Sequence, residues 1–265
     1  MTRIAWTTMP FFQVDAFADR PLTGNPAAVM PLQEWLDDRL MQAIAAENNL
    51  SETAFTVPSE RDDADFDLRW FTPTDEVDLC GHATLAAGHI LIQSAPVRFA
   101  TRAGILTVTR RDDLLELDLP APRLSEVHEA ALTRALGLPD GPAWLADGCN
   151  DTAIIELADE AAVRSVEPDF AALRAVSRMA VVTARGDHQT VASRVFVPYL
   201  GIDEDPVTGS AHAALTRYWA DRLGRAEFTA LQASKRGGIL HCRLDGDRVL
   251  LGGLCQTVIV GQFQL

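Results

Sequence analysis

Three short segments of the sequence carry side chains that can move protons. Glu52 follows Asn48-Asn49-Leu50-Ser51, the run Cys80-Gly81-His82 places a thiol two residues from an imidazole, and Asp205 comes shortly before Thr208-Gly209-Ser210. Carboxylate, imidazole and thiol groups are common general acids and bases in enzymes. Taken by itself, Glu52 at the start of a predicted strand would be interpreted as a surface carboxylate, so these residues do not on their own establish a reaction.

Two other chemistries fit the same residues less well. Ser210 lacks the Gly-x-Ser-x-Gly turn of a hydrolase nucleophile, and His212, two residues on, faces elsewhere on a helix. A zinc site at Cys80, His82 and His89 has no common ligand spacing and no carboxylate nearby in the sequence, so His89 is interpreted as a core histidine. No Gly-x-Gly-x-x-Gly follows a strand pattern. We therefore expect no metal and no nucleotide cofactor.

The sequence repeats itself in three places that keep the same order. The paired segments are Arg69-Trp70-Phe71-Thr72-Pro73 with Arg194-Val195-Phe196-Val197-Pro198, Cys80-Gly81-His82-Ala83 with Thr208-Gly209-Ser210-Ala211, and Gly104-Ile105-Leu106 with Gly238-Ile239-Leu240. The offsets grow slowly, from 125 to 128 to 134 residues. An ordered repeat of this kind predicts two structurally similar lobes.

The hydrophobic pattern predicts three helices and many short strands. Residues 34–47 form an amphipathic helix, whereas 82–93 and 211–223 are apolar almost all round and must be buried on every side, although Arg217 and Asp221 give the last helix a wetter face. The expected strands cover residues 11–17, 27–30, 53–57, 67–71, 105–109, 115–119, 180–183, 191–197, 240–244, 249–251 and 256–263.

A buried helix among many short strands implies a sheet that curls around it. We therefore expect an α+β fold with two pseudo-symmetric lobes, each a β-barrel-like sheet around a central helix. The first lobe covers residues 1–120 and the second 123–255, with Pro120-Ala121-Pro122 between them. The strand within 256–265 has no counterpart in the repeat, and we expect it to complete the first lobe.

Both repeats place a glycine and a small polar residue where a buried helix begins. The first N–H groups of a helix have no partner inside it and carry a partial positive charge, so they bind carboxylate or phosphate. Such a site would use the backbone of Gly81, His82, Gly209 and Ser210. In the alternative interpretation, Thr208 and Ser210 simply cap a helix. The duplication favours an anion site.

Composition excludes several classes of partner. The net charge is −14, from 23 basic and 37 acidic residues, which argues against nucleic acid and anionic membranes as partners. Schiff-base chemistry would have to use Lys235, the single lysine. The uncharged stretch 79–97 contains two histidines and a proline, so it predicts a core helix instead of a membrane span.

The cysteines and the first residues bear on the compartment. Cys80, Cys149, Cys242 and Cys255 are widely spaced and form no Cys-x-x-Cys motif. The opening sequence MTRIAWTTMPFF has no pattern typical of a signal peptide. We therefore expect a reduced, cytoplasmic setting.

Several motifs together resemble the PhzF family of phenazine-biosynthesis-type isomerases. The resemblance extends from about Phe12 to Gly253. It rests on Gln13-Val14-Asp15-Ala16-Phe17, Gly24-Asn25-Pro26-Ala27-Ala28-Val29, Asn49-Leu50-Ser51-Glu52-Thr53-Ala54-Phe55, Phe71-Thr72-Pro73, Cys80-Gly81-His82-Ala83-Thr84 and Glu204-Asp205-Pro206-Val207-Thr208-Gly209-Ser210-Ala211.

The resemblance implies a fold similar to diaminopimelate epimerase, with an active site between the lobes. It implies an isomerase of biosynthetic type that uses no cofactor or metal and moves a proton on a small, carboxylate-bearing carbon acid. A homodimer is compatible with it. By position in the motifs, the implied catalytic residues are Glu52 (the general acid/base), His82, Asp205 and Ser210, and the implied substrate-binding residues are Cys80, Gly81, Thr208 and Gly209.

Cys80 departs from the phenazine enzyme, which has no cysteine before its Gly-His. Diaminopimelate epimerase has catalytic cysteines at the two corresponding helix starts, but here the second position is Thr208. Two alternatives therefore stay open. One is an amino-acid epimerase or racemase that uses Cys80, and the other is a non-catalytic small-molecule binding protein on the same fold.

Overall fold

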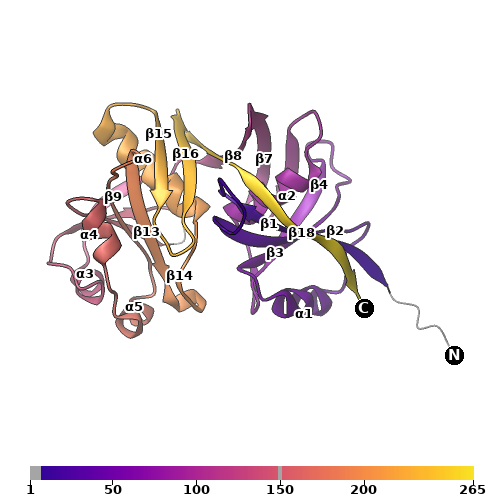
Figure 1. The fold of residues 1–265 in the computed structure, drawn as a ribbon, viewed down its shortest axis with the longest axis horizontal. Helices are drawn as coiled ribbons and strands as arrows, with labels where there is room; N and C mark the ends of the chain where they lie inside the picture. The colour runs from indigo at the N-terminus through magenta and orange to yellow at the C-terminus, as the bar shows by residue number, and fades with distance from the viewer. Residues whose placement is uncertain (1–6, 149–150) are drawn as a thin grey trace. The chain divides into compact units, whose positions relative to one another are not determined.

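The computed structural model describes residues 7–148 and 151–265, so Cys149 and the first six residues of the opening sequence lie outside the described residues. The chain divides into two compact units (Figure 1). Unit 1 comprises the residues up to Leu22, Pro26–Leu117 and Leu254–Leu265. Unit 2 comprises Thr23–Asn25 and Asp118–Gly253. Each unit is described by itself below.

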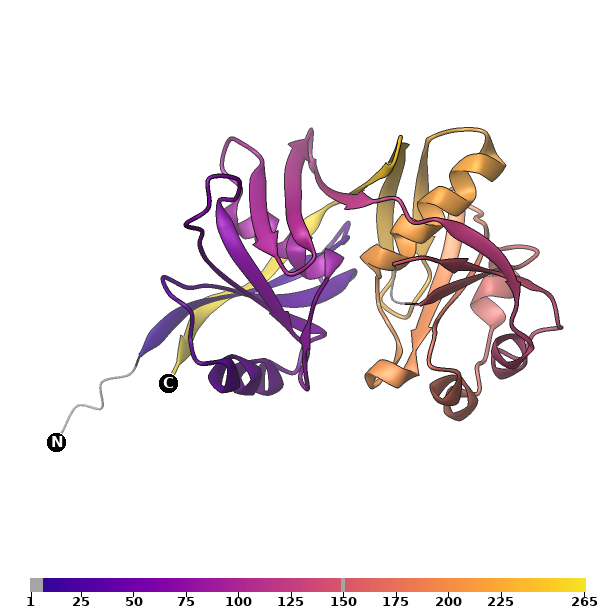
Figure 2. The ribbon, with the colours of Figure 1, turned by 180° about the vertical axis from the view of Figure 1, so that it is seen from behind.

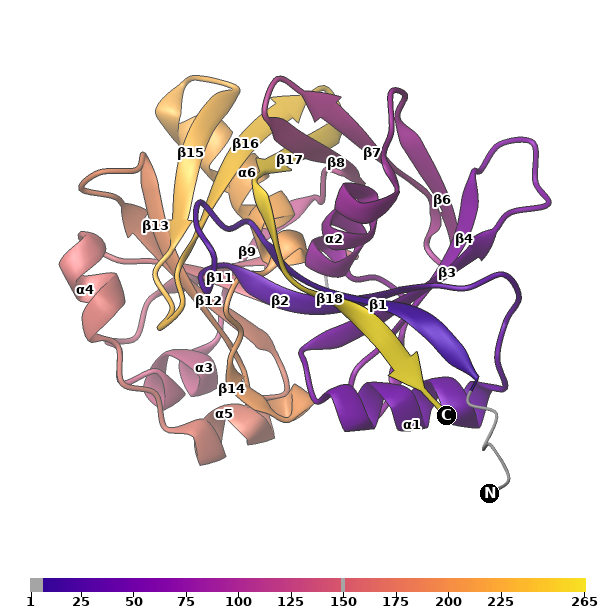
Figure 3. The ribbon, with the colours of Figure 1, turned by 45° about the vertical axis from the view of Figure 1, so that its right-hand side comes forward.

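Unit 1 consists of strands wrapped around one central helix, with a second helix outside the sheet (Figure 3). Its strands run in the order β18, β1, β2, β3, β4, β6, β7, with the short β5 paired to β4. The elements of this part of the chain are β1 (Thr8–Ala16), β2 (Asn25–Pro31), α1 (Asp38–Asn48), β3 (Glu52–Pro58), β4 (Phe66–Phe71), β5 (Glu76–Val77), α2 (Gly81–Leu91), β6 (Val97–Thr101), β7 (Gly104–Arg111), β8 (Leu114–Pro120) and β18 (Cys255–Gln264).

The two helices of unit 1 differ because their sequences differ. Every residue of α2 from Gly81 to Gly88 is buried, so the helix is packed on all sides. Helix α1 buries only Met41, Ile44 and Ala45, which pack against Phe55 of β3. Because β3 alternates, Phe55 faces α1, whereas Glu52, Ala54 and Thr56 point to the opposite face, toward α2.

Unit 2 repeats this plan around helix α6 (Figure 2). Its strand order is β9, β10, β11, β12, β13, β15, β16, β17, with the short β14 paired to β13. The elements are β9 (Leu124–His128), α3 (Ala130–Ala135), β10 (Pro142–Ala146), β11 (Thr152–Glu156), α4 (Glu160–Ser165), α5 (Phe170–Val176), β12 (Met179–Arg185), β13 (Val191–Val197), η1 (Pro198–Leu200), β14 (Ile202–Glu204), α6 (Gly209–Leu223), β15 (Glu227–Gln232), β16 (Gly238–Asp245) and β17 (Arg248–Gly253).

The strand orders confirm the predicted duplication. In both units a parallel pair (β2 with β3, β11 with β12) is followed by an antiparallel partner and then by a second parallel pair (β4 with β6, β13 with β15). The C-terminal strand β18 pairs with β1 along nine positions and occupies the place that β9 has in unit 2. The expectation that this strand has no counterpart was therefore wrong, because the order of the two strands along the chain is permuted.

The repeated arginine explains part of the Arg-x-Phe-x-Pro motif. Arg69 forms two hydrogen bonds with Glu76, at 2.7 and 2.8 Å, and lies 5.2 Å from the ring centre of Phe71. Arg194 forms two hydrogen bonds with Glu204, at 2.7 and 3.0 Å, and its guanidinium lies 4.8 Å from the ring of Phe196. Each arginine thus fastens the short strand before the central helix to the long strand next to it.

The predicted helices exist, but their limits shift. The first helix begins at Asp38 instead of residue 34, because Asp37 accepts a hydrogen bond from the Arg39 N–H and acts as its N-cap. The last begins at Gly209 instead of residue 211. Arg217 and Asp221 form an ion pair on its wetter side, as the sequence indicates.

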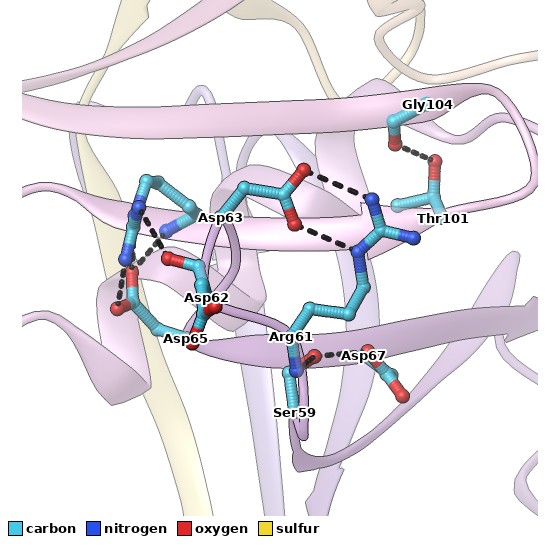
Figure 4. Close-up of polar contacts among 9 residues, drawn as sticks. Ser59, Arg61, Asp62, Asp63, Asp65, Asp67, Thr101 and Gly104 are labelled. Atoms are coloured by element: carbon cyan, nitrogen blue, oxygen red, sulfur yellow. Dashed lines mark hydrogen bonds and ion pairs between the residues drawn. The ribbon is translucent and has the colours of Figure 1, made fainter.

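The acidic run after β3 is a structural ion-pair cluster. Arg61 binds Asp63 through two hydrogen bonds of 2.8 and 2.9 Å, and Arg98 binds Asp65 (Figure 4). Ser59 donates to Asp67 at 2.6 Å. The carboxylates in these contacts are held by side chains of the same unit, which gives this run a role in loop structure.

Among the described residues, no helix is both long and apolar enough to cross a membrane.

Gly88 of α2 is expected to tolerate no side chain. A Cβ atom there would lie 2.6 to 2.9 Å from three carbon atoms of Val108 on β7. We expect Gly88→Ala to lower the free energy of unfolding by about 1 kcal/mol. Overpacking costs about 1–3 kcal/mol, and the preference of alanine over glycine in a helix offsets about 1 kcal/mol of that cost. Urea unfolding measures the change.

Val108→Ala supplies the control for Gly88→Ala. It removes two of the three close atoms, so the cost of Gly88→Ala in that background should fall by at least about 1 kcal/mol. Equal costs in the two backgrounds would contradict the close packing of α2 against β7.

Candidate functional site

Glu52 is positioned by the junction between α1 and β3. Asn49 adopts a left-handed conformation (φ 48°) and ends α1, with its N–H bonded to the Ala45 carbonyl at 3.1 Å. Asn48 donates to the Thr53 hydroxyl at 3.1 Å, which ties the helix end to the strand. Glu52 is then the first residue of β3, on the face toward α2. The Asn-Asn-Leu-Ser-Glu segment thus builds a turn that fixes one carboxylate.

Glu52, His82 and Cys80 come together in unit 1. Glu52 Oε2 lies 3.0 Å from His82 Nε2, and Cys80 Sγ lies 3.5 Å from His82 Nδ1. The imidazole therefore stands between a carboxylate and a thiol, with one ring nitrogen toward each. The side chain of His82 is only 6% exposed, whereas that of Glu52 is 18% exposed. Glu52 is the member of this pair that a molecule in solution reaches more easily.

Electrostatics favour a charged His82. Burial alone would lower the pKa of His82, but the negative charges that Cys80 and Glu52 can carry outweigh burial and raise this pKa well above its ordinary value. Burial and the charge of Glu52 raise the pKa of the Cys80 thiol. A protonated imidazole carries a hydrogen on each ring nitrogen, so it can donate to Glu52 through Nε2 and to Cys80 through Nδ1.

The same three residues are the metal-ligand candidates of the described chain. One ligand atom from each lies within 4.8 Å of the others. The structure thus supplies the carboxylate that the local sequence lacks for a zinc site. His89 is not part of the group: its Nε2 lies 3.0 Å from the Thr257 hydroxyl. Both ring nitrogens of His82 face Glu52 and Cys80 themselves, so the arrangement matches a chain of proton donors and acceptors better than a metal cage.

Asp205 belongs to a separate group in unit 2. It is buried, and its two carboxylate oxygens accept hydrogen bonds from the Asn25 amide, at 3.0 Å, and from the Thr208 hydroxyl. Gln232 donates to the Asp205 carbonyl at 2.7 Å and accepts from the Thr208 N–H at 2.8 Å. Asp205 is therefore part of a buried, hydrogen-bonded group and not of a solvated acidic loop.

Asn25 and Gln232 are the residues that the motif analysis missed as members of this group. Asn25 lies 180 residues from Asp205 in sequence, and Gln232 lies 27 residues away, on β15. Both side chains are fully buried. Asn25 stands within a segment of the family resemblance, Gly24-Asn25-Pro26, which is the one signal that could have found it.

The beginnings of α2 and α6 are similar. Cys80 and Thr208 occupy the N-cap positions with extended backbones, and neither side chain caps its helix. The alternative interpretation, in which the Thr208 side chain caps α6, is wrong because its hydroxyl donates to Asp205 instead. Ser210 lies in the first turn of α6, not at its cap, and is also buried. Neither first turn contains an acidic residue. The backbone N–H groups of Gly81, His82, Gly209 and Ser210 therefore keep the positive end of each helix dipole.

A hollow of about 870 Å³ in unit 2 does not involve these residues. It lies among α3, α4 and the end of β11, and its lining includes Trp144, Glu156 and Glu167. Glu156 accepts a hydrogen bond from the Tyr218 hydroxyl at 2.7 Å. No basic side chain lines the hollow in the described chain, so it does not suit an anionic substrate.

The fold and the two groups together define a class of protein: a two-lobed α+β protein of the diaminopimelate epimerase type. Comparison with solved structures supports the fold. A PhzF-family phenazine biosynthesis protein from Enterococcus faecalis superposes with a TM-score of 0.88 at 41% identity, covering 98% of this chain and 100% of that one. A hydroxyproline epimerase from Agrobacterium vitis, 15% identical, shares the fold with a TM-score of 0.61, covering 97% of this chain and 93% of that one.

The chain belongs to the PhzC-PhzF family, described as phenazine biosynthesis-like protein, whose pattern matches residues 14–261. An uncharacterized isomerase of Pseudomonas aeruginosa is 49% identical over 264 residues, covering 97% of this chain and 99% of that protein. The human phenazine biosynthesis-like domain-containing protein is 37% identical over 284 residues, which cover 96% of this chain and 98% of that protein. These findings support an isomerase-type enzyme.

Proposed function

We propose that the protein is an isomerase that needs no cofactor and moves a proton on a small carbon acid bearing a carboxylate, with Glu52 as the general acid/base. The observation that carries this proposal is the partly exposed Glu52 carboxylate, 3.0 Å from a buried His82. A base must reach the substrate, while its partner can stay buried and set its protonation state. The P. aeruginosa relative that is called an isomerase supports the reaction class.

In the proposed step, the Glu52 carboxylate removes a proton from a carbon next to a carboxylate or carbonyl group. The electron pair of the C–H bond moves into that group and forms an enolate-like anion. If a carbon–carbon double bond is conjugated with this anion, the proton returns from Glu52 to the far carbon of that bond. The double bond shifts along the chain, and the isomerisation is complete with no net gain or loss of atoms. His82 holds the side-chain carboxyl group of Glu52 through Nε2. The N–H groups at the start of α2 stabilise the negative charge that develops on the substrate.

We propose that Asp205, Ser210, Thr208 and Gly209 serve the same substrate. The support is the duplication, which gives the start of α6 the same uncapped form as the start of α2. Because both oxygens of Asp205 accept hydrogen bonds from Asn25 and Thr208, its role in this proposal is to hold and orient, not to accept a proton. Thr208 and Gly209, like Cys80 and Gly81, contact the substrate.

A cytoplasmic location is supported by the free thiols of Cys80, Cys242 and Cys255.

Deuterium incorporation tests the proposal directly. The protein is incubated in D₂O with a set of small carboxylic acids, and each acid is examined by mass spectrometry for gain of deuterium at carbon. The proposal expects at least one acid to gain deuterium with the wild-type protein and not with Glu52→Gln. Ligands that bind tightly but never exchange would instead support the non-catalytic binding protein.

Cys80 favours a second candidate, an epimerase or racemase. Its thiol lies across the imidazole from Glu52, 3.5 Å from Nδ1. A thiol could donate a proton to one face of the substrate carbon while Glu52 removes the proton on the other face. This candidate predicts deuterium at a single carbon together with inversion of its configuration, whereas the isomerase moves the proton to a different carbon.

The anion site makes a further prediction. Gly209→Val is expected to weaken binding of a carboxylate or of sulfate at least about tenfold, because the new side chain fills the approach to the N–H groups of α6. His82→Ala should weaken it less, because the proposed contacts are to backbone. Calorimetric titration with sulfate measures both, and circular dichroism confirms that each variant is folded. If Gly209→Val binds sulfate as tightly as the wild type, the anion does not bind at this position.

A further inference from the structure

Gln232, the last residue of β15, links the two ends of the segment 205–208 that precedes α6. Its side chain is fully buried. The amide oxygen accepts from the Thr208 N–H at 2.8 Å, and the amide nitrogen donates to the Asp205 carbonyl at 2.7 Å. Because one partner is a backbone donor and the other a backbone acceptor, only one orientation of the amide satisfies both. Gln232 therefore fixes these two backbone groups relative to each other.

The same amide sets the direction of the hydrogen bond between Thr208 and Asp205. Gln232 Nε2 also donates to the Thr208 hydroxyl oxygen, at 3.3 Å. A hydroxyl group has one hydrogen, and Thr208 donates it to one carboxylate oxygen of Asp205. Asn25 Nδ2 donates to the other oxygen at 3.0 Å. These hydrogen bonds all run toward the Asp205 carboxylate and hold it by both oxygens.

The matching position in unit 1 has no carboxylate. The equivalent arginines of the two units bind Glu76 and Glu204, and each glutamate comes four residues before the N-cap of its central helix. The residue that follows is Val77 in unit 1 and Asp205 in unit 2. The carboxylate before α6 is therefore a feature of unit 2 and not of the repeat.

The matching position in unit 1 also has no amide. Thr101 and Gln232 are each the last residue of their strand, and they stand opposite Gly104 on β7 and Gly238 on β16. The Thr101 hydroxyl donates to the Gly104 carbonyl at 2.7 Å, within its own turn (Figure 4). Unit 1 builds the same fold around α2 with this threonine. The shared fold therefore does not require the contacts that Gln232 makes.

We propose that Gln232 is a positioning residue for substrate binding: it holds Asp205 and Thr208 in the orientation in which they meet the substrate, and does not touch the substrate itself. This inference rests on the proposed function, which places Asp205, Thr208 and Gly209 against the substrate. Because Gln232 accepts from the Thr208 N–H, the N–H groups of Gly209 and Ser210 are the ones that remain for a carboxylate. Groups held in this way before binding lose less freedom when the ligand arrives.

Gln232→Met keeps most of the side-chain volume and removes both hydrogen-bonding groups. On an acid that exchanges deuterium, it should raise KM at least about tenfold and lower kcat less than about threefold, because uniform binding is lost while the step at Glu52 is kept. Glu52 lies in unit 1, where its contact with His82 is unaffected. In an Asp205→Asn background, the effect of Gln232→Met on KM should be at least about threefold smaller, since the two residues act together.

Thr183→Val separates positioning from a general loss of stability. The Thr183 hydroxyl donates to the Ala192 carbonyl at 2.8 Å and accepts from the Trp219 indole at 3.0 Å. This variant therefore also removes buried hydrogen bonds from unit 2, but none to the segment 205–208. Both variants should unfold at a lower urea concentration than the wild type, and only Gln232→Met should raise KM. An unchanged KM in Gln232→Met, or an equal rise in both variants, would overturn the proposal.

Sulfate binding distinguishes a failure of this inference from a failure of the proposed function. If no acid exchanges deuterium with the wild type, the proposed function fails, and calorimetric titration with sulfate still tests Gln232. Gln232→Met should then bind sulfate at least about threefold more weakly than the wild type, and Thr183→Val as tightly as the wild type. Equal affinities of Gln232→Met and wild type, or no binding of sulfate to the wild type, would overturn the inference.

Discussion

Replacing Glu52 by glutamine is expected to lower turnover at least about a hundredfold while substrate binding persists. Glutamine keeps the shape and the position at the start of β3 but cannot take up a proton from carbon. General acid–base groups contribute about 10²- to 10⁴-fold to enzymatic rates, which sets the size of the expected loss. Steady-state kinetics on any acid that exchanges deuterium measures turnover, and calorimetry of the same acid measures binding.

Glu47→Gln is the matched control for Glu52→Gln, because Glu47 is an exposed glutamate in the last turn of α1 and contacts none of the three site residues. It should change the rate by less than about twofold. Full activity of Glu52→Gln would contradict both the isomerase and the epimerase.

Cys80→Ala separates the two reactions. If the protein is an isomerase, removing the Cys80 thiol should lower turnover less than removing the side chain of His82 or of Asp205, because these two orient the site. In the epimerase, it should abolish turnover in one stereochemical direction as severely as Glu52→Gln does. A comparison of the two variants on one active substrate therefore decides between the reactions.

Acid is expected to destabilise the protein through His212, before most carboxylates are protonated. His212 is completely buried in α6, where its Nδ1 lies 2.8 Å from the Thr208 carbonyl and Nε2 lies 3.4 Å from the Ser193 hydroxyl. Nδ1 therefore carries a proton and donates it to the carbonyl. Burial lowers the pKa of His212 from 6.5 to about 4.

The direction of the pH effect follows from this lowered pKa. Between about pH 4 and 6.5 the unfolded chain binds a proton at His212 that the folded chain does not, so stability falls as the pH falls through this range. One pKa unit corresponds to about 1.4 kcal/mol, so protonation of His212 alone should lower the free energy of unfolding by about 2–3 kcal/mol between pH 7.5 and 4.5. His82 has a raised pKa, so its contribution is present at low pH and is lost as the pH rises.

His212→Asn isolates this contribution, since asparagine can still donate to the Thr208 carbonyl but does not titrate. Urea unfolding from pH 7.5 to 4.5 should show a loss about 2–3 kcal/mol smaller in this variant than in the wild type, whatever its absolute stability. The exposed His188, changed to asparagine, is the control and should leave the pH dependence as it is in the wild type. If the free energy of unfolding depends on pH equally in His212→Asn and in the wild type, His212 is not neutral and buried in the folded protein.

The sequence predicted the duplicated architecture because the repeated segments lie at the structural centre of each unit. Arg69 and Arg194 hold equivalent strands, and Gly81 and Gly209 begin equivalent helices. The apolar pattern of residues 82–93 is typical of a helix that is buried all round, and the helix has that environment.

Residues 124–176 were not resolved into elements by sequence reasoning. Helices α3, α4 and α5 have only six or seven residues, fewer than two turns, so no helical period can be established. Their ends depend on single side chains, such as Asp159 and Asp169, which accept hydrogen bonds from the first turns of α4 and α5.

The candidate site was predictable in its members and not in its contacts. Glu52 and His82 could each be named from a motif, but their 3.0 Å contact depends on which face of β3 meets α2. Asn25, which donates to the carboxylate of Asp205, and Gln232, which donates to its carbonyl, come from distant parts of the chain. Neither residue in isolation carries a pattern that marks it as a partner of Asp205. Tertiary structure alone brings these residues together.

The pairing of β18 with β1 has a consequence for biosynthesis. Multidomain proteins generally fold from the N-terminus as they leave the ribosome. Here β1 is made first, but its partner follows the whole of unit 2 in the chain, since β18 begins at Cys255. Unit 2, whose last residue is Gly253, has all of its strands before that point. The second unit can therefore finish folding before the first. During synthesis, the edge of β1 that pairs with β18 stays unpaired until the last strand has been translated.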